Sequence, residues 1–553
     1  MDLPDSLLHL LFHIYSKCTF LNVLGAFVFL VLAAYLIERF ITGVAYPPSI
    51  PLIREPEGAR SFSLRTRISY YTECKAIYED AWNQYLKHGR PVVVPGIGSR
   101  KEVILPPEHI RWALAQPESR LSVAEAMAEV DQAHWSLGHA GPVLDSWQGL
   151  LIKTELNRSL ETICSALSDE LGRAFDKHFG TDTTTWREID LRNTITKVVA
   201  QANSRFTVGL PLCRNEGYLQ ALLDVNDLLI TVGGFCSGLP HVLRPFLGGL
   251  LSIPMKFKID HIKQWLVPLW DDRIRMAREA KAAGANGFSM PEPTDHVQAM
   301  ARYALRERPN EVDDYELIVR RICAANFGAV HQTVIQVTNL LLNIIDSDHQ
   351  HNTIATLLDE SDRILSDSDP AAADSDEVTG QWTKGRVNRM VFADSASRET
   401  LRLQSFANRS LIRKVMTNDM ATPDGHPLPK GTIVSFLVWP SQTNPDAYED
   451  PLTYDPFRFA RSGSNPGDDG SEEKKTQTFV TTSQDYLAFG HGKHACPGRF
   501  IVDFELKMII NHVLRYYDVR FPDEYEGKKP PNDWMCEATF PPRGVRICVR
   551  RKA

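Results

Sequence analysis

The sequence predicts a mainly α-helical protein that begins with a single transmembrane helix, and two segments indicate this. Residues 18–37 form a run of twenty residues without a charge, which is about the length that crosses the hydrocarbon part of a bilayer. Residues 312–345 contain no proline and a single glycine, and their apolar side chains recur at helical spacing. A helix of that length would extend about 51 Å, enough to cross a whole domain.

The N-terminal run is predicted to be a membrane anchor, residues 1–45, and not a cleaved signal peptide. A signal peptide would be shorter, with more basic residues in front and a small-residue cleavage site behind. Lys17 is the basic residue ahead of the run, whereas five arginines follow it between Arg39 and Arg67. This bias predicts that the long C-terminal part lies in the cytosol. A buried helix of a soluble domain is the alternative interpretation.

Composition excludes several classes of protein. The chain has 553 residues, 43% of them hydrophobic, which is enough for a sizeable core. Its net charge of −7 gives no indication of nucleic-acid binding. The nine cysteines are dispersed without a Cys-x-x-Cys pair, which argues against a disulfide framework or a zinc site.

One cysteine lies in a segment that carries chemistry. Residues 489–498 read Phe-Gly-His-Gly-Lys-His-Ala-Cys-Pro-Gly. The glycines and the Pro-Gly pair predict a tight loop in which the sulfur of Cys496 stands forward and backbone N–H groups point at it. Such donors stabilise a thiolate, the form that a haem iron accepts as an axial ligand.

Two other interpretations fit parts of this segment. Gly490, Gly492 and Ala495 fit a loose dinucleotide-binding fingerprint, but no buried strand precedes them and helical spacing follows them. Cys496 could also be an ordinary core cysteine.

The segment resembles the haem-binding loop of the cytochromes P-450, which reads Phe-Gly-x-Gly-x-(Arg/His)-x-Cys-x-Gly, at every fixed position. The resemblance implies haem b as the cofactor, Cys496 as the axial iron ligand, Phe489 in the haem contact and His494 placed to reach a haem propionate. It also implies the cytochrome P-450 fold, mainly α with a smaller β-sheet region, in one catalytic domain over residues 46–553. Motifs between residues 320 and 500 would converge on one site there.

Two further motifs of the same family occur in the expected order. Glu399 and Arg402 are three residues apart and would share a helix face, where such pairs are usually exposed. Residues 455–459, Asp-Pro-Phe-Arg-Phe, resemble the family's Pro-x-Arg-Phe segment, so Arg458 is expected to join the pair in a buried structural network. A guanidinium suits this role because its planar fork binds a carboxylate through two hydrogen bonds.

Two more basic residues are assigned by resemblance to the haem propionates. Arg413 follows the Glu399 segment where the family has an arginine that binds a propionate. Lys153 would take the place of another basic ligand, and simple surface exposure is the alternative for it. A propionate carries a full negative charge, so a basic partner is physically reasonable.

The oxygen-activating turn departs from the family pattern. Residues 328–333 read Gly-Ala-Val-His-Gln-Thr, where the family usually has Ala/Gly-Gly-x-Asp/Glu-Thr-Thr/Ser. His331 occupies the acid position and can shuttle protons near neutral pH. Gln332 replaces the usual threonine, and Thr333, about 100° further round a helix, fills the next position. These three are the candidate catalytic residues, although His331 could instead bond a carbonyl across a kink.

The resemblance implies a monooxygenase that uses O₂ and electrons from NADPH, delivered by a separate NADPH–cytochrome P-450 reductase, with cytochrome b5 as a further donor. Residues 208–215 and 479–483 look like cytochromes P-450 of filamentous fungi, which oxidise terpenoids and other lipophilic intermediates of secondary metabolism. The expected location is the endoplasmic reticulum membrane, with a single pass and a cytosolic catalytic domain. An isomerase or dehydratase that needs no O₂, and a non-catalytic haem or ligand binder, are the alternatives.

Three stretches outside the motifs remain open. Residues 228–254 are mostly apolar and fall where the family forms the roof of its pocket, which could also dip into the membrane; plain helix packing explains them equally well. Residues 361–386 and 461–475 are polar and poor in packing residues, so loops are expected there.

Overall fold

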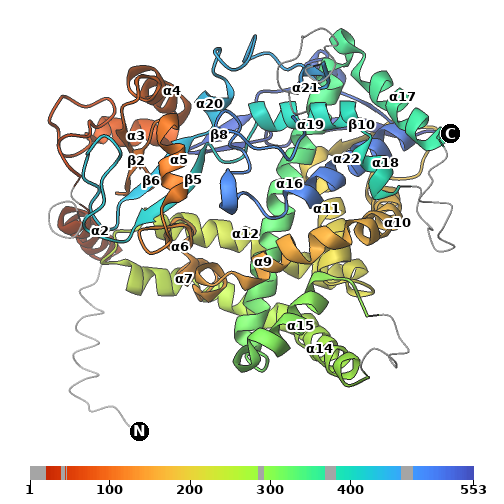
Figure 1. The fold of residues 1–553 in the computed structure, drawn as a ribbon, viewed down its shortest axis with the longest axis horizontal. Coiled ribbons are helices and arrows are strands. Elements are labelled where there is room, and N and C mark those ends of the chain that lie inside the picture. Colours follow the sequence, from red (N-terminus) through yellow and green to blue (C-terminus); the bar gives the residue numbers. More distant parts are fainter. Residues whose placement is uncertain (1–19, 39–43, 45, 284–291, 368–381, 462–476) are drawn as a thin grey trace.

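Helices make up most of the fold, and the three sheets found in the described part of the chain are small (Figure 1). The computed structural model describes residues 20–38, 44, 46–283, 292–367, 382–461 and 477–553. The longer helices are α2 (Phe20–Ile37), α3 (Leu64–Thr72), α4 (Cys74–Gln84), α6 (Val123–Val130), α9 (Trp147–Thr154), α10 (Leu160–Phe179), α11 (Leu191–Thr207), α12 (Glu216–Gly238), α14 (Ile253–Ala283), α15 (His296–Glu307), α16 (Tyr315–His351), α17 (Thr353–Ser366), α19 (Val391–Leu403) and α22 (Arg499–Tyr516). The short ones are α5 (Ile110–Ala115), α7 (Ala133–Ser136), α8 (Gly141–Leu144), α13 (Gly249–Leu251), α18 (Lys384–Asn388), α20 (Trp439–Gln442) and α21 (Arg458–Arg461). The prediction of a mainly α fold with a smaller β region is confirmed.

The largest sheet has five strands in the order β1-β2-β6-β5-β3. β2 and β6 are parallel, and the other neighbours are antiparallel. A three-stranded sheet has the order β4-β10-β7, and β8 and β9 form a hairpin. The strands are β1 (Val92–Pro95), β2 (Lys101–Ile104), β3 (Leu121–Ser122), β4 (Arg187–Asp190), β5 (Arg409–Val415), β6 (Ile433–Leu437), β7 (Tyr517–Arg520), β8 (Asp533–Met535), β9 (Ala538–Phe540) and β10 (Arg546–Arg551).

The long helix predicted from apolar spacing is α16. It begins at Tyr315, three residues later than the periodicity suggested, because the side chain of Asp314 accepts a hydrogen bond from the N–H of Leu317 at 3.0 Å and caps the helix. It runs six residues further than predicted, until Asn352 ends it with a left-handed φ of 52°. The helix is about 55 Å long and passes through the middle of the domain in Figure 1.

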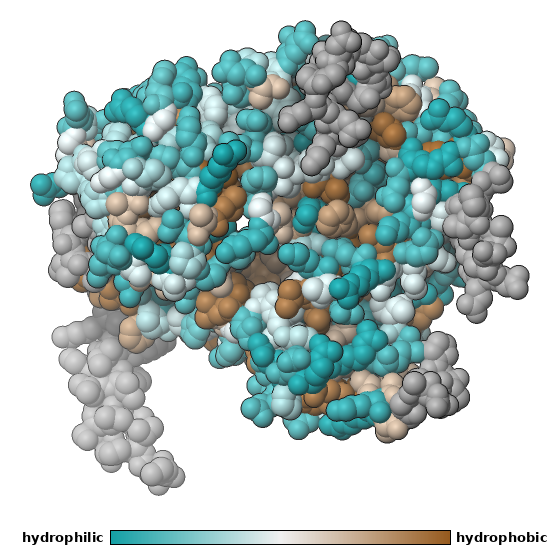
Figure 2. Space-filling view, viewed as in Figure 1, coloured by the Kyte–Doolittle hydropathy of each residue, from teal (hydrophilic) through white to brown (hydrophobic). Residues whose placement is uncertain are grey.

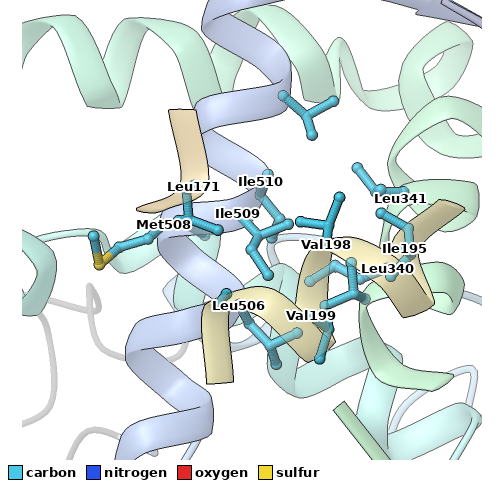
Figure 3. Packing of buried hydrophobic residues seen from close by; sticks show 14 of the residues in the cluster. Leu171, Ile195, Val198, Val199, Leu340, Leu341, Leu506, Met508, Ile509 and Ile510 are labelled. Atoms are coloured by element: carbon cyan, nitrogen blue, oxygen red, sulfur yellow. The ribbon is translucent and has the colours of Figure 1, made fainter. Parts of the chain in front are cut away.

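The described residues form three hydrophobic cores, and two of them fix α16 in place. The first lies between α10, α11, α16, α19 and α22, and Figure 3 shows apolar side chains of α11, α16 and α22 meeting in it. The second lies between the five-stranded sheet and the helices α3 and α4. The third joins α9, α12, α14 and α15 to the first part of α16. Because the first and third cores pack against its two halves, α16 holds the side chains of its middle turns in fixed positions.

α2 corresponds to the predicted transmembrane helix, whose first two residues lie outside the described part. Large apolar side chains on it are exposed, namely Leu24, Phe27, Val28, Phe29, Leu30, Leu32, Leu36 and Ile37. Among the described residues, one helix, α12, is long and apolar enough to cross a membrane, and the apolar stretch Leu24–Ile37 is shorter. In α12, 44% of the apolar window is buried, and the helix belongs to the third core.

Candidate active site

Cys496 lies in a tight loop between the five-stranded sheet and α22. Gly490 and Gly492 have φ angles of 69° and 71°, which other residues adopt only with strain. The N–H of Cys496 donates to the carbonyl of Phe489 at 2.8 Å and closes the loop. Burial raises the pKa of the Cys496 thiol, whereas the backbone N–H groups of Gly498 and Arg499 bond to the sulfur and lower it. A bound metal ion would add positive charge that favours the thiolate further.

Basic side chains gather beside this loop. Arg413 is buried in β5, directly after a register shift between Ser410 and Arg413 that re-aims the strand. Its Nη1 donates to the Ile412 carbonyl at 3.0 Å, and its buried Nη2 has no hydrogen-bond partner among the described residues. Burial lowers the pKa of Arg413 to about 10.

His494 lies near Arg413. Its Nε2 is 3.3 Å from a carboxylate oxygen of Glu118, and burial followed by the charge of Arg413 lowers its pKa. Lys153, exposed on α9, contributes to the same shift. The structure therefore brings Arg413 and His494 together near the Glu118 carboxylate, and Lys153 lies close enough to His494 for its charge to act there.

These residues fit a haem. An unpartnered buried guanidinium N–H group needs an acceptor, and a propionate provides one. The glycine backbone of the loop allows close approach of a flat ring, and Cys496 as a residue is only partly buried. Cys496 would hold the iron, Arg413 and His494 would hold propionates, and Phe489, whose ring centroid is 5.2 Å from that of Phe479, would support the loop.

Arg413→Met should weaken haem retention while leaving the chain folded. The substitution keeps the length of the side chain but removes the donors, so the haem loses a charged partner worth about 1.5–3 kcal/mol. The haem-to-protein ratio after gel filtration measures the effect. Arg120→Met is the matched control, because Arg120 pairs with Asp419 on the surface. Equal haem content in both variants would contradict the role of Arg413.

In the Glu399 network, Glu399 and Arg402 are fully buried and Arg458 is partly buried. Glu399 accepts hydrogen bonds from Nε and Nη2 of Arg402, both at 2.7 Å, and from Nε of Arg458 at 3.1 Å. The N–H of Asp455 adds a further bond at 3.2 Å. The structure thus joins all three predicted network residues in one cluster.

This network reaches the cysteine loop through Gln442. Arg402 donates to the Gln442 carbonyl at 2.8 Å. The side-chain oxygen of Gln442 accepts the N–H groups of Leu487 and Ala488, each at 3.0 Å. Ala488 precedes Phe489, whose carbonyl binds the N–H of Cys496. Hydrogen bonds, joined through the covalent bonds of Gln442 and of the Ala488–Phe489 peptide, therefore connect Glu399 to Cys496.

In the middle turns of α16, some residues are accessible and others are buried. Gly328 and Gln332 are exposed although the helix around them is packed on both sides, and they lie one turn apart on the same face. Thr333 is buried, and its hydroxyl oxygen has no hydrogen-bond partner among the described residues. Apart from its own helix backbone and its two chain neighbours, no described residue lies within 4 Å of the position of a Cβ on Gly328, so Gly328 and Gln332 border an open space, the α16 cavity. Figure 2 shows a hollow with hydrophobic residues at its bottom, near the place of α9 and α16 in Figure 1.

His331 lies among aromatic rings. Its ring is stacked on Phe327 at 6.0 Å and edge-on to Phe406 at 5.6 Å, and Phe406 contacts Phe540 at 5.4 Å. Burial lowers the pKa of His331 to about 4, and the charge of Arg192 acts in the same direction. The imidazole is therefore neutral at physiological pH. Its Nε2 is buried and bonds to no other described residue.

Sequence reasoning did not find several residues that hold this site. Arg398 donates to the carbonyls of Thr478 and Thr481, at 2.5 and 2.7 Å, and so supports the segment before the cysteine loop. Arg499 donates to the Cys496 carbonyl at 2.8 Å. Arg398 directly precedes Glu399, and Arg499 directly follows Gly498. Their positions beside these motifs could have indicated a structural role from the sequence alone. Gln442 lies in no motif, and its role depends on tertiary contacts alone.

The fold and this loop define a haem-thiolate protein. Residues 79–549 match the sequence pattern of the family described as cytochrome P-450. The chain therefore belongs to the cytochrome P-450 family, as its motifs suggested, and it is an oxygenase enzyme with haem as its cofactor.

Similar proteins cover nearly the whole chain. The cytochrome P-450 monooxygenase astC of Aspergillus terreus is 44% identical over 526 residues, which are 95% of this chain and 96% of that protein. The cytochrome P-450 monooxygenase pbrC of Penicillium brasilianum is 45% identical over 520 residues, 94% of this chain and 95% of the relative. The cytochrome P-450 monooxygenase tenB of Beauveria bassiana is 39% identical over 509 residues, 91% and 92% of the two chains.

Proposed function

We propose that this protein is a membrane-anchored haem-thiolate monooxygenase that hydroxylates or otherwise oxidises a lipophilic intermediate, a terpenoid or a similar compound, in secondary-metabolite biosynthesis. The observation that carries the proposal is the Cys496 loop, in which the N–H groups of Gly498 and Arg499 face the sulfur. When bound, the haem supplies the redox chemistry that reduces O₂ and transfers one oxygen atom to the substrate, and a thiolate ligand favours cleavage of the O–O bond.

The aromatic residues around His331 support a lipophilic substrate. Phe327 and Phe406 flank His331, and Phe540 extends this aromatic wall. Aromatic side chains bury a large apolar area of a ligand and exclude water from it. Gln332 is the accessible polar group on this side of α16, where its amide can orient a water or a polar group of the substrate.

Electrons would come from NADPH through a separate NADPH–cytochrome P-450 reductase, with cytochrome b5 as a further donor. The sequence contains no recognisable flavin-binding segment, so a flavoprotein partner is required for this chemistry. Residues 46–553 would form the catalytic domain that receives these electrons.

Exposed apolar side chains support attachment to the endoplasmic reticulum membrane through residues 1–45. α2 carries one such group, and a second lies at the end of α12 and the start of α14: Phe235, Val242, Phe246, Leu250, Ile253 and Phe257. The two are joined, because the hydroxyl of Tyr35 donates to the Gly238 carbonyl at 2.5 Å and Glu38 accepts the N–H of His241 at 3.0 Å. Exposed apolar side chains that lie together in this way mark a membrane or partner contact.

Expression in a host that makes terpenoid or polyketide precursors tests this function. The expected result is a product heavier by one oxygen atom, detected by mass spectrometry, in cells that also hold a reductase. The same cells should yield the protein in the microsomal pellet, and deletion of residues 1–38 should reduce that fraction. Cells that show no oxygenated product with any precursor class would contradict the proposal.

One observation favours a second function. Gln332 faces the cavity at the turn where the family usually places an alcohol. A haem-thiolate isomerase or dehydratase needs neither O₂ nor electrons and so does not need that alcohol. Turnover that persists without NADPH and reductase would identify this second function.

A further inference from the structure

A cavity of about 240 Å³ lies at one edge of the first core, between α10, α22 and β10. α22 lines it with Met508, His512 and Tyr516, which are four residues apart and therefore share one helix face. α10 faces them with two small residues, Ser168 and Gly172. Outside its own stretch of α10, the nearest described atom to a Cβ on Gly172 would be Cε1 of His512, at 3.9 Å. The small residues of α10 thus leave space in front of the His512 ring.

This cavity is separate from the candidate active site. His512 lies about 20 Å along α22 from Arg499, which begins that helix directly after the loop that carries Cys496. Figure 3 shows Met508 and Leu171, which both line the cavity, on the side of the core away from α16. A molecule bound here would therefore not lie in the α16 cavity.

The imidazole of His512 has a buried nitrogen, Nε2, that bonds to none of the described residues. The ring is stacked on Phe175 at 4.9 Å and tilted against Tyr516 at 4.7 Å, so its orientation is fixed. Burial lowers the pKa of His512 to about 4; the charge of Arg551 acts in the same direction and that of Asp176 opposes it. The imidazole is therefore neutral, and Nε2 accepts or donates a hydrogen bond according to the tautomer. Leaving it unpaired is unfavourable.

The walls of the cavity favour a neutral aromatic ligand. The indole of Trp382 and the thioether of Met508 are surfaces on which an aromatic ring packs well. Arg551 is paired with Asp176 at 2.6 Å, so its charge is balanced and does not select an anion. Apolar cavities of about 150 Å³ bind benzene, so this larger one has room for a substituted ring. Ser168 is partly accessible, which leaves a way in from solvent.

We propose that this cavity binds a small phenol, with its ring against Trp382 and Met508 and its hydroxyl hydrogen-bonded to Nε2 of His512. A hydroxyl matches a neutral imidazole because it donates to an unprotonated Nε2 and accepts from a protonated one. A carboxylate can only accept, and an ammonium group can only donate. The inference goes beyond the proposed function, since occupation of this site requires no turnover.

Calorimetric titration of the full-length, haem-loaded protein with para-cresol and with para-xylene tests the site. The two probes differ only in a hydroxyl that takes the place of a methyl group. We expect para-cresol to bind at least about fivefold more tightly, because it makes the additional hydrogen bond. His512→Phe keeps a ring against Phe175 and removes both nitrogens. In this variant the preference should disappear, while the affinity for para-xylene should change less than about twofold.

Gly172→Leu fills the cavity and should abolish the binding of both probes at this site. Binding in the α16 cavity is followed separately through the Soret band, and that titration should be the same in Gly172→Leu and in the wild type. Arg173→Leu is the matched control, because it places the same side chain on the exposed side of α10.

Equal affinity of the two probes in the wild type overturns the inference, and so does a preference for para-cresol that persists in His512→Phe. If His512→Phe does not fold, Gly172→Leu decides. Binding that survives in Gly172→Leu, or that always accompanies a Soret change, places the probes elsewhere and also overturns the inference. Absence of binding shows that the cavity holds water alone. A failure of the proposed monooxygenase function would leave these titrations unchanged.

Discussion

Cys496→Ala is expected to abolish the strongly red-shifted Soret band of the reduced, carbon monoxide-treated protein. Alanine removes the sulfur to which the N–H groups of Gly498 and Arg499 are directed, and no other side chain replaces an axial thiolate. Monooxygenase activity should fall below detection, because O–O cleavage depends on that ligand. The difference spectrum of purified protein measures the first effect, and product formation measures the second.

Cys536→Ala is the control for this substitution. Cys536 is also partly buried, but it lies at the turn of the β8–β9 hairpin and packs against the second core. Its variant should keep the full band and full activity. A red-shifted band that persists in Cys496→Ala would contradict the assignment of the iron ligand, and with it the proposed chemistry.

Glu399→Gln is expected to destabilise the protein by about 3–5 kcal/mol, because it leaves the buried guanidinium of Arg402 without its counter-charge. Both side chains of this pair are fully buried, and Arg458 loses a partner as well. Since Arg402 also holds the Gln442 carbonyl, the cysteine loop should loosen and haem content should fall with stability. The midpoint of denaturant unfolding and the haem-to-protein ratio measure the two effects.

Glu279→Gln provides the comparison. Glu279 forms a pair with Arg275 at 3.3 Å on the exposed side of α14, with half or more of both side chains accessible. Surface pairs contribute about 0–1 kcal/mol, so the unfolding midpoint should hardly move. If the two variants unfold at the same denaturant concentration, Glu399 is not the structural centre that its burial indicates.

Local patterns in the sequence predicted the long helix and the residues around the cysteine. Apolar spacing predicted α16, and its ends differed by three and six residues because Asp314 and Asn352, not periodicity, set them. The function of the segment from Phe489 to Gly498 could be predicted because few kinds of site need glycines and a cysteine at this spacing. The structural role of the Glu399 and Arg402 pair could be predicted only together with Arg458, since such pairs are common on helix surfaces.

The sequence by itself determined the family, the mainly α fold and the candidate iron ligand, because these depend on residues that are neighbours along the chain. Tertiary structure alone decided that Thr333 is buried while Gln332 is accessible, and that burial among aromatic rings lowers the pKa of His331. It also revealed Gln442, which acts on a segment more than 40 residues away. Burial, the direction of a side chain and the partner of a hydrogen bond depend on what packs against a residue, and neighbours in sequence do not specify that.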